Sequence, residues 1–222
     1  MVVSAQDLAA YPRTSTGSIS GSSVATGGYI VQTNLNIGAV AVKGIDVQAA
    51  YKHPLPMNLG SMSYVFAGSE LLSSTTIQYP GAPEYDCVGL FGPACQTVNP
   101  RWRHNLRASW ETPWNVEFSA LWRFIGPVTL DNNSNQPLIG GGTYDSFDAR
   151  MPGMNYLDLF ASWKILDNIQ VRAGVNNVFD KDPPLVGTSS GTGPTSSNNG
   201  NTFPQMYDAL GRHFFVSVTA KF

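Results

Sequence analysis

Hydrophobic and polar residues alternate with a period of two along several stretches of the chain. This is the pattern of strands with two different faces. In the clearest stretch, 101–111, Trp102 and Trp110 share one face while Arg103 and Arg107 share the other. Helical periodicity is hard to find. We therefore predict an all-β, antiparallel protein of about eight strands, expected near 29–36, 45–52, 59–73, 101–111, 116–124, 156–166, 169–176 and 213–222.

The connections between these strands alternate in length. Tight turns follow Lys52, Glu111 and Leu166, whereas the connections at 77–100, 126–155 and 179–207 are long and rich in Gly, Pro, Ser, Thr and Asn. Loops longer than about 12–15 residues are uncommon in compact soluble domains. Antiparallel strands would place every tight turn at one end and every long loop at the other. That asymmetry is typical of outer-membrane β-barrels, with short periplasmic turns and long extracellular loops.

The composition narrows the class further. Charged residues make up 13% of the 222 residues, about half the ~25% of an average soluble domain. The formal net charge is −2 and no block of Lys and Arg is present, which argues against a nucleic-acid partner. No run approaches the ~18–20 apolar residues that a membrane-spanning helix needs.

Aromatic residues suggest which face meets lipid. Tyr51, Trp110 and Trp163 each lie two to four residues before a tight turn, on the apolar face. Amphipathic rings favour the headgroup level of a bilayer, so this row resembles one aromatic belt of a membrane barrel. Phe222 would lie at the same end. The alternative is that these bulky rings fill the bottom of a soluble core.

The opposite face is rich in Ser, Asn and Gln, as the lining of a water-filled lumen would be. Its charged residues are the candidates for function. They either pair across strands and keep the lumen wet, or they contact a plug or a passing polar ligand. The lumen-facing candidates are Arg103, Arg107, Glu117, Arg123, Asp158, Lys164 and Arg172.

Two cysteines, Cys87 and Cys95, lie in the 77–100 loop with seven residues between them. In an exported protein such a pair most simply forms a disulfide, whereas zinc usually needs four ligands and no His lies nearby. The stretch 131–135 resembles the start of a calcium loop. Because Gln136 and Gly142 stand where that loop needs Gly and Glu, we expect a solvated loop instead.

We find no catalytic set, no metal site and no cofactor motif in the sequence, and so predict a protein that is not an enzyme. His53, His104 and His213 are scattered and are expected to be packing or interface residues.

Several segments resemble one family. Residues 173–184 (AGVNNVFDKDPP) and 207–216 (YDALGRHFFV), with the terminal Lys221-Phe222, resemble the last two strands of TonB-dependent outer-membrane receptors. Residues 36–46, and the cysteine loop with 99–104, are also similar to that family. The resemblance covers about 28–222 and implies an outer-membrane barrel of 22 strands around an N-terminal plug.

Neither a plug nor a TonB-binding box is found, so we expect residues 28–222 to be the last eight strands of such a receptor. Residues 1–27 would be a truncated loop or a boundary segment. The first residues do not form a signal peptide, which also suggests a piece of a longer protein.

The resemblance implies energy-coupled uptake through the Gram-negative outer membrane of a scarce ligand: a siderophore, cobalamin or an oligosaccharide. It implies as partners the TonB complex, which would act through the missing plug, outer-membrane lipid, and the assembly machinery, for which Phe222 would be the signal. Two alternatives are a complete eight-stranded barrel with an anchoring or adhesion role and a soluble, secreted β-sandwich.

Overall fold

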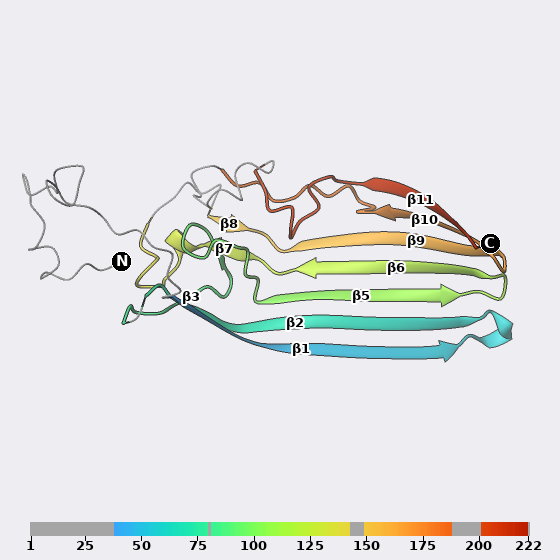
Figure 1. Cartoon of the computed structure of the whole chain (residues 1–222), viewed down its shortest axis with the longest axis horizontal. Coiled ribbons are helices and arrows are strands. Elements are labelled where there is room, and N and C mark those ends of the chain that lie inside the picture. Colours follow the sequence, from blue (N-terminus) through green and yellow to red (C-terminus); the bar gives the residue numbers. More distant parts are fainter. Residues whose placement is uncertain (1–37, 80, 143–148, 188–200, 222) are drawn as a thin grey trace, which may run out of the picture. The chain divides into compact units, whose positions relative to one another are not determined.

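The computed structural model describes residues 38–79, 81–142, 149–187 and 201–221. The candidate strand at 29–36, the segment 1–27 and Phe222 lie outside these residues. One large antiparallel sheet dominates the described part of the chain (Figure 1). Its long strands, in their order across the sheet, are β1 (Ala39–Pro54), β2 (Ser61–Ile77), β5 (Trp102–Glu111), β6 (Val116–Ile125), β9 (Met154–Leu166), β10 (Ile169–Asn176) and β11 (His213–Ala220).

Short elements occupy the connections. β3 (Tyr85–Asp86) pairs with β2 at the margin of the large sheet. β4 (Leu90–Phe91), β7 (Val128–Leu130) and β8 (Arg150–Met151) form a small second sheet, in which β4 and β7 run parallel. Two 3₁₀ turns, η1 (Pro56–Asn58) and η2 (Asp131–Asn133), complete the elements. In the described ranges, no helix has the length and apolarity to cross a membrane.

The predicted all-β, antiparallel architecture is confirmed. Each long strand corresponds to one of the expected stretches, with ends shifted by a few residues and with β1 and β2 longer than expected. The alternation of connections is also present. The tight turns lie together at one end of the strands, and the long connections lie at the other (Figure 1). We call these ends the turn end and the cap end.

The strand register separates two faces of the sheet. Directly paired residues of an antiparallel sheet lie on the same side. One row joins Leu106, Trp122 and Leu157, whereas the neighbouring row joins Arg107, Leu121 and Asp158. We call the first side the apolar face and the second the polar face.

The apolar face is open. Tyr51 and Trp163 are 64% and 50% exposed, and in the described residues no second sheet lies on them. The β-sandwich alternative is therefore wrong. The sheet is also not closed on itself, because β1 and β11 are its two edges in the part of the chain that the structure describes.

Candidate functional site

The long connections fold together at the cap end. We call their described residues, within 78–101, 126–153 and 177–212, the loop cap. A hydrophobic core runs through the loop cap and the adjoining strand ends. Its buried residues are Phe91, Val98, Ile125, Val128, Leu130, Met151, Met154, Tyr156, Val186, Phe203 and Tyr207. All three connections contribute to this core, so the loop cap is a packed unit rather than three independent loops.

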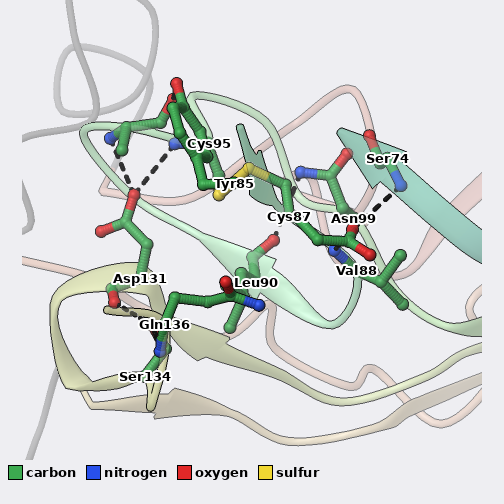
Figure 2. Close-up of a disulfide and its surroundings, with 12 residues drawn as sticks. Ser74, Tyr85, Cys87, Val88, Leu90, Cys95, Asn99, Asp131, Ser134 and Gln136 are labelled. Atoms are coloured by element: carbon green, nitrogen blue, oxygen red, sulfur yellow. Dashed lines mark hydrogen bonds between the residues drawn. A yellow bond between two sulfur atoms is a disulfide. The ribbon is translucent and has the colours of Figure 1, made fainter. Parts of the chain in front are cut away.

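A disulfide joins Cys87 and Cys95 within the first connection (Figure 2). The two sulfur atoms are 2.04 Å apart, and both residues are buried. Tyr85 and Leu90 pack with them in a second, smaller core. The disulfide is therefore buried in a small apolar cluster of its own.

Asp131, from the second connection, holds from outside the ring that the disulfide closes (Figure 2). The residue is 1% exposed, and its Oδ2 accepts hydrogen bonds from the backbone N–H groups of Ala94 at 2.7 Å and Cys95 at 2.9 Å. Oδ1 accepts a third, from the N–H of Asn132 at 2.8 Å. Hydrogen bonds to a carboxylate are stronger than those between neutral groups. The carboxylate thus links two connections that are far apart in sequence.

Gly92 makes the close approach of this carboxylate feasible. Its φ of +138° lies in a region that other residues rarely adopt, and a Cβ there would overlap the carboxylate of Asp131. The expectation of a solvated loop at 131–135 was therefore wrong for Asp131. Backbone donors satisfy the carboxylate, and no group of metal-binding side chains is found within the described residues.

A charged cluster joins the loop cap to the polar face. Arg123, on β6, donates from Nε to Asp158 Oδ2 at 2.7 Å and from Nη2 to Oδ1 at 3.0 Å. The same guanidinium donates to both carboxylate oxygens of Asp208, at 3.1 and 2.5 Å. Asp158 is on β9, whereas Asp208 belongs to the third connection. One guanidinium therefore ties two strands and the loop cap together in two bidentate pairs.

The surroundings of this cluster reduce its contact with water. The Asp158 side chain is 3% exposed, and its Oδ1 also accepts the N–H of Asn177 at 2.8 Å. The guanidinium carbon of Arg123 lies 4.9 Å from the ring centre of Tyr156, in cation–π geometry. Two carboxylates share one cation, so the formal charge of the cluster is −1 and every oxygen of both carboxylates has a donor.

A hollow of about 360 Å³ lies on the polar face beside this cluster. Strand residues Asp46, Arg103, Asn105 and Arg123 line it together with Gln205 from the loop cap. Asp46 accepts a hydrogen bond from Ser69 Oγ at 2.6 Å. Arg103 is exposed, and its guanidinium has no ion-pair or hydrogen-bond partner among the described residues, which leaves its charge available to whatever occupies the hollow.

Tyr207 anchors the third connection in the core of the loop cap. It is 2% exposed, and burial raises the pKa of its phenol above the ordinary value, with the neighbouring Tyr156 adding to the shift. Among the described residues its hydroxyl has no hydrogen-bond partner. The group is therefore held neutral.

The register places all seven lumen-facing candidates on the polar face, but it brings only one pair into contact. Arg123 and Asp158 form the ion pair described above. Arg107 instead donates to Ser119 Oγ at 3.1 Å, and its guanidinium lies 5.2 Å from the ring centre of Phe160.

The other candidates lie apart. Glu117 and Arg172 line a separate, smaller hollow of about 230 Å³ nearer the turn end. Lys164 donates to Asp167 at 2.8 Å in the turn between β9 and β10, and this hydrogen bond holds the pKa of Asp167 below its ordinary value. The seven residues share a face, therefore, without forming one site.

Sequence reasoning missed Asp131 and Asp208, which link separate parts of the loop cap to each other and to the sheet. Both are acidic residues in long loops, where acids are common, and no periodicity identifies their partners. Asp208 did carry a signal, since it belongs to the 207–216 segment that suggested the family resemblance. Asp131 offered only the misleading start of a calcium loop.

Comparison with known proteins gives one family and a set of solved structures. The family described as "TonB dependent receptor-like, beta-barrel" matches residues 7–178. No curated protein sequence matches the chain. Similar solved structures include crystal structures of the ferric enterobactin receptor of Pseudomonas aeruginosa. A mutant form has 17% identity, covers 82% of this chain and 22% of its own, and has a TM-score of 0.49.

A second mutant of that receptor, solved in complex with enterobactin, has 16% identity, the same coverage and a TM-score of 0.47. The chain thus spans about 22% of the length of these receptors. The family match begins earlier than the resemblance seen in the sequence, at residue 7 rather than 28, and it ends before the last strand.

Proposed function

Because this chain belongs to the TonB-dependent receptor-like β-barrel family, we propose that it is part of an outer-membrane receptor of a Gram-negative bacterium. The complete receptor imports a scarce ligand with energy that the TonB complex transmits from the inner membrane. The chain supplies a section of barrel wall and the loop cap above it. Its role is binding and transport rather than catalysis.

The observation that carries this proposal is the open apolar face of the sheet. Large residues such as Tyr51, Phe118 and Trp163 are about half exposed or more on a surface that spans many strands. Soluble monomers rarely expose contiguous apolar patches larger than a few hundred Å². In a bilayer these side chains would contact lipid chains instead of water, so their exposure would carry no cost. An apolar outer band and a polar interior are the arrangement of a membrane barrel.

The two free edges support a larger barrel. Unpaired N–H and C=O groups along a strand are costly inside a bilayer, so a sheet that spans a membrane must close on itself. In the described residues β1 and β11 do not pair with each other. Pairing with further strands of the receptor satisfies both edges, whereas a complete eight-stranded barrel would need β11 to meet a strand outside the described residues.

We assign the two ends of the sheet to different tasks. The loop cap, with its disulfide, lies at the extracellular end and captures the ligand, and a disulfide suits an exported protein. The polar face lines the lumen, where the seven candidates and the hollow beside Arg103 meet the plug or the passing ligand. Phe222 serves as the assembly signal. The ligand is a siderophore, cobalamin or an oligosaccharide.

Uptake by the complete receptor tests this function. A strain that lacks the receptor gene is complemented with the full-length gene and supplied with one candidate ligand at limiting concentration. Growth on one class of ligand is expected to require both the receptor and a functional TonB protein. A receptor that passes ligand equally well without TonB is a passive pore, and this result would contradict the proposal.

A further inference from the structure

The cap end of the apolar face carries a cluster of five rings with His104 at its centre. The imidazole is in edge-to-face contact with Trp122, at 4.6 Å between ring centres, and stacks on Phe124 at 5.3 Å. Phe66 and Trp102 complete the cluster, with ring centres 5.5 and 6.0 Å from that of His104. These residues come from three adjacent strands, β2, β5 and β6. We call them the cap-end belt.

The sheet is shaped to hold this cluster. Gly68, on β2, pairs directly with His104, and a Cβ at this position would lie 2.7 Å from the Trp102 ring and 3.0 Å from Phe66. The absence of a side chain therefore lets the indole lie against the sheet. The Trp122 indole is fixed as well, because its Nε1 donates to Asn155 Oδ1 on β9 at 2.9 Å.

Hydrogen bonding defines the tautomer of His104. Trp102 Nε1, which can only donate, lies 2.8 Å from His104 Nδ1. Nδ1 is therefore the acceptor, and the neutral imidazole carries its proton on Nε2. No described residue hydrogen bonds to Nε2, and His104 is partly exposed. Among the five rings of the belt, His104 Nε2–H is therefore the donor without a partner in the described residues, and the exposed amide of Asn155 lies beside it on the same face.

A second row of rings lies near the turn end of the same face. Trp110 contacts Trp114 and Phe118, with ring centres 6.4 and 5.9 Å apart, and its Nε1 donates to the Leu59 carbonyl at 2.8 Å. Trp102 and Trp110 are eight residues apart on one strand, which is about 27 Å along the strand. A tilt of about 40° reduces this to about 20 Å along the membrane normal, close to the ~25 Å apolar band of membrane barrels.

The part of the apolar face between the two rows of rings is uncharged, as a surface in contact with hydrocarbon must be. Apolar-face positions of β5, β6 and β9 between the rows carry no Asp, Glu, Lys or Arg. The polar groups of this face lie within the two rows of rings and include the indole N–H groups and the imidazole. Rings with one apolar side and one polar group favour the headgroup level.

We propose that the cap-end belt is a docking surface for outer-leaflet lipid, in which His104 Nε2–H donates to a headgroup phosphate oxygen while the surrounding rings meet the upper acyl chains. An uncharged ring surface suits hydrocarbon, and the free N–H donor of His104 suits an anion. This proposal rests on the proposed outer-membrane location. Beyond that location, the proposal specifies which residues form the outer boundary of the apolar band and which headgroup atom His104 binds.

The first test is tryptophan quenching in the full-length receptor, reconstituted in phosphatidylethanolamine–phosphatidylglycerol vesicles. Difference spectra between wild type and Trp102→Phe, and between wild type and Trp163→Phe, isolate each indole, since Trp102 lies at the cap end of β5 and Trp163 at the turn end of β9. Lipid brominated near the glycerol is expected to quench both indoles at least two-fold more than lipid brominated at the chain ends.

The two indoles separate the two hypotheses. Quenching of Trp163 by lipid without quenching of Trp102 overturns the cap-end proposal and leaves the outer-membrane function intact, since another protein or a second copy then covers the belt. The absence of lipid quenching at both positions contradicts the outer-membrane location itself.

The second test addresses the donor. Unfolding midpoints of the receptor are compared in phosphatidylglycerol and in an uncharged, phosphate-free glycolipid with the same chains. The wild type is expected to unfold at higher temperature with phosphate headgroups. His104→Phe, which keeps a ring of similar size, loses that headgroup-dependent shift, whereas His213→Phe on the polar face retains it. Equal shifts in wild type and His104→Phe overturn the phosphate assignment.

Discussion

Arg123 is the residue at which strand and loop cap meet, and its two bidentate pairs depend on each other. Asp158 and Asp208 approach one another because the guanidinium lies between them. Removing the cation would leave two carboxylates facing each other with little access to water. Breaking a buried ion pair from one side is more costly than the net contribution of the intact pair.

Arg123→Met is therefore expected to destabilise the receptor by about 3 kcal/mol, at the low end for a broken buried pair because Arg123 keeps some access to water. Arg172→Met is the matched control on the same face. Arg172 is exposed and donates to Gln170 at 3.3 Å, so a change within about 0.5 kcal/mol is expected. Denaturant unfolding in detergent micelles measures both. Equal stability of the two variants would show that the cluster is not a link.

Tyr207 gives a pH-dependent prediction. Burial raises its pKa in the folded state, whereas the unfolded phenol titrates near its ordinary value of about 10. A folded pKa above the unfolded one means that stability is complete below about pH 10 and falls as pH rises beyond it. Unfolding of wild type and Tyr207→Phe from pH 8 to 11 measures this loss.

The Tyr207→Phe variant is expected to lose less stability than wild type above about pH 10, because it has no phenol to ionise. Tyr79→Phe, at a position that is 42% exposed, serves as the control and should follow the wild type. Parallel pH profiles for wild type and Tyr207→Phe contradict the buried, neutral state of this group.

Among the structural elements, the long strands could be predicted from the sequence, whereas the packing of the loop cap could not. Alternation of apolar and polar residues identifies strands such as Trp102–Glu111 and Met154–Leu166, because successive side chains of a strand point to opposite faces. The packing of Phe91 against Phe203, with ring centres 6.0 Å apart, joins residues more than a hundred positions apart and leaves no periodic trace. The Cys87–Cys95 pairing was expected because no other cysteine exists.

The hydrogen bonds between Asp131 and the disulfide ring can be tested by substitutions at two glycines. Gly92 and Gly89 both have positive φ, at +138° and +75°, but only at Gly92 would a Cβ meet Asp131, whereas nothing lies within 4 Å at Gly89. Gly89→Ala is expected to cost about 1 kcal/mol from backbone strain. Gly92→Ala adds the steric overlap, for a total of about 3 kcal/mol.

Hydrogen exchange of the loop cap measures this effect locally. Faster exchange at the Ala94 and Cys95 amides is expected in Gly92→Ala, because their acceptor is displaced. Similar exchange in the two glycine variants would argue that Asp131 does not hold the ring.

At the scale of the whole molecule, the open edges of the sheet determine what the chain can do alone. β1 and β11 each leave one side unpaired in the described residues. We therefore expect the isolated 222-residue chain to give no heat-modifiable, compact monomer on gels in detergent. The full-length receptor should give one. A compact, heat-modifiable species from the isolated chain would instead favour a self-contained small barrel.

Which face of the sheet meets lipid can be measured directly at two neighbouring positions. Asn105 and Leu106 are neighbours on β5, the first on the polar face beside the hollow and the second on the apolar face. Nitroxide labels at Asn105→Cys and Leu106→Cys of the full-length receptor in bilayers report collisions with oxygen and with a water-soluble nickel complex. The label at 106 is expected to favour oxygen, which concentrates in hydrocarbon, and the label at 105 is expected to favour the nickel complex. Preference for nickel at 106 would contradict the assignment of the apolar face to lipid.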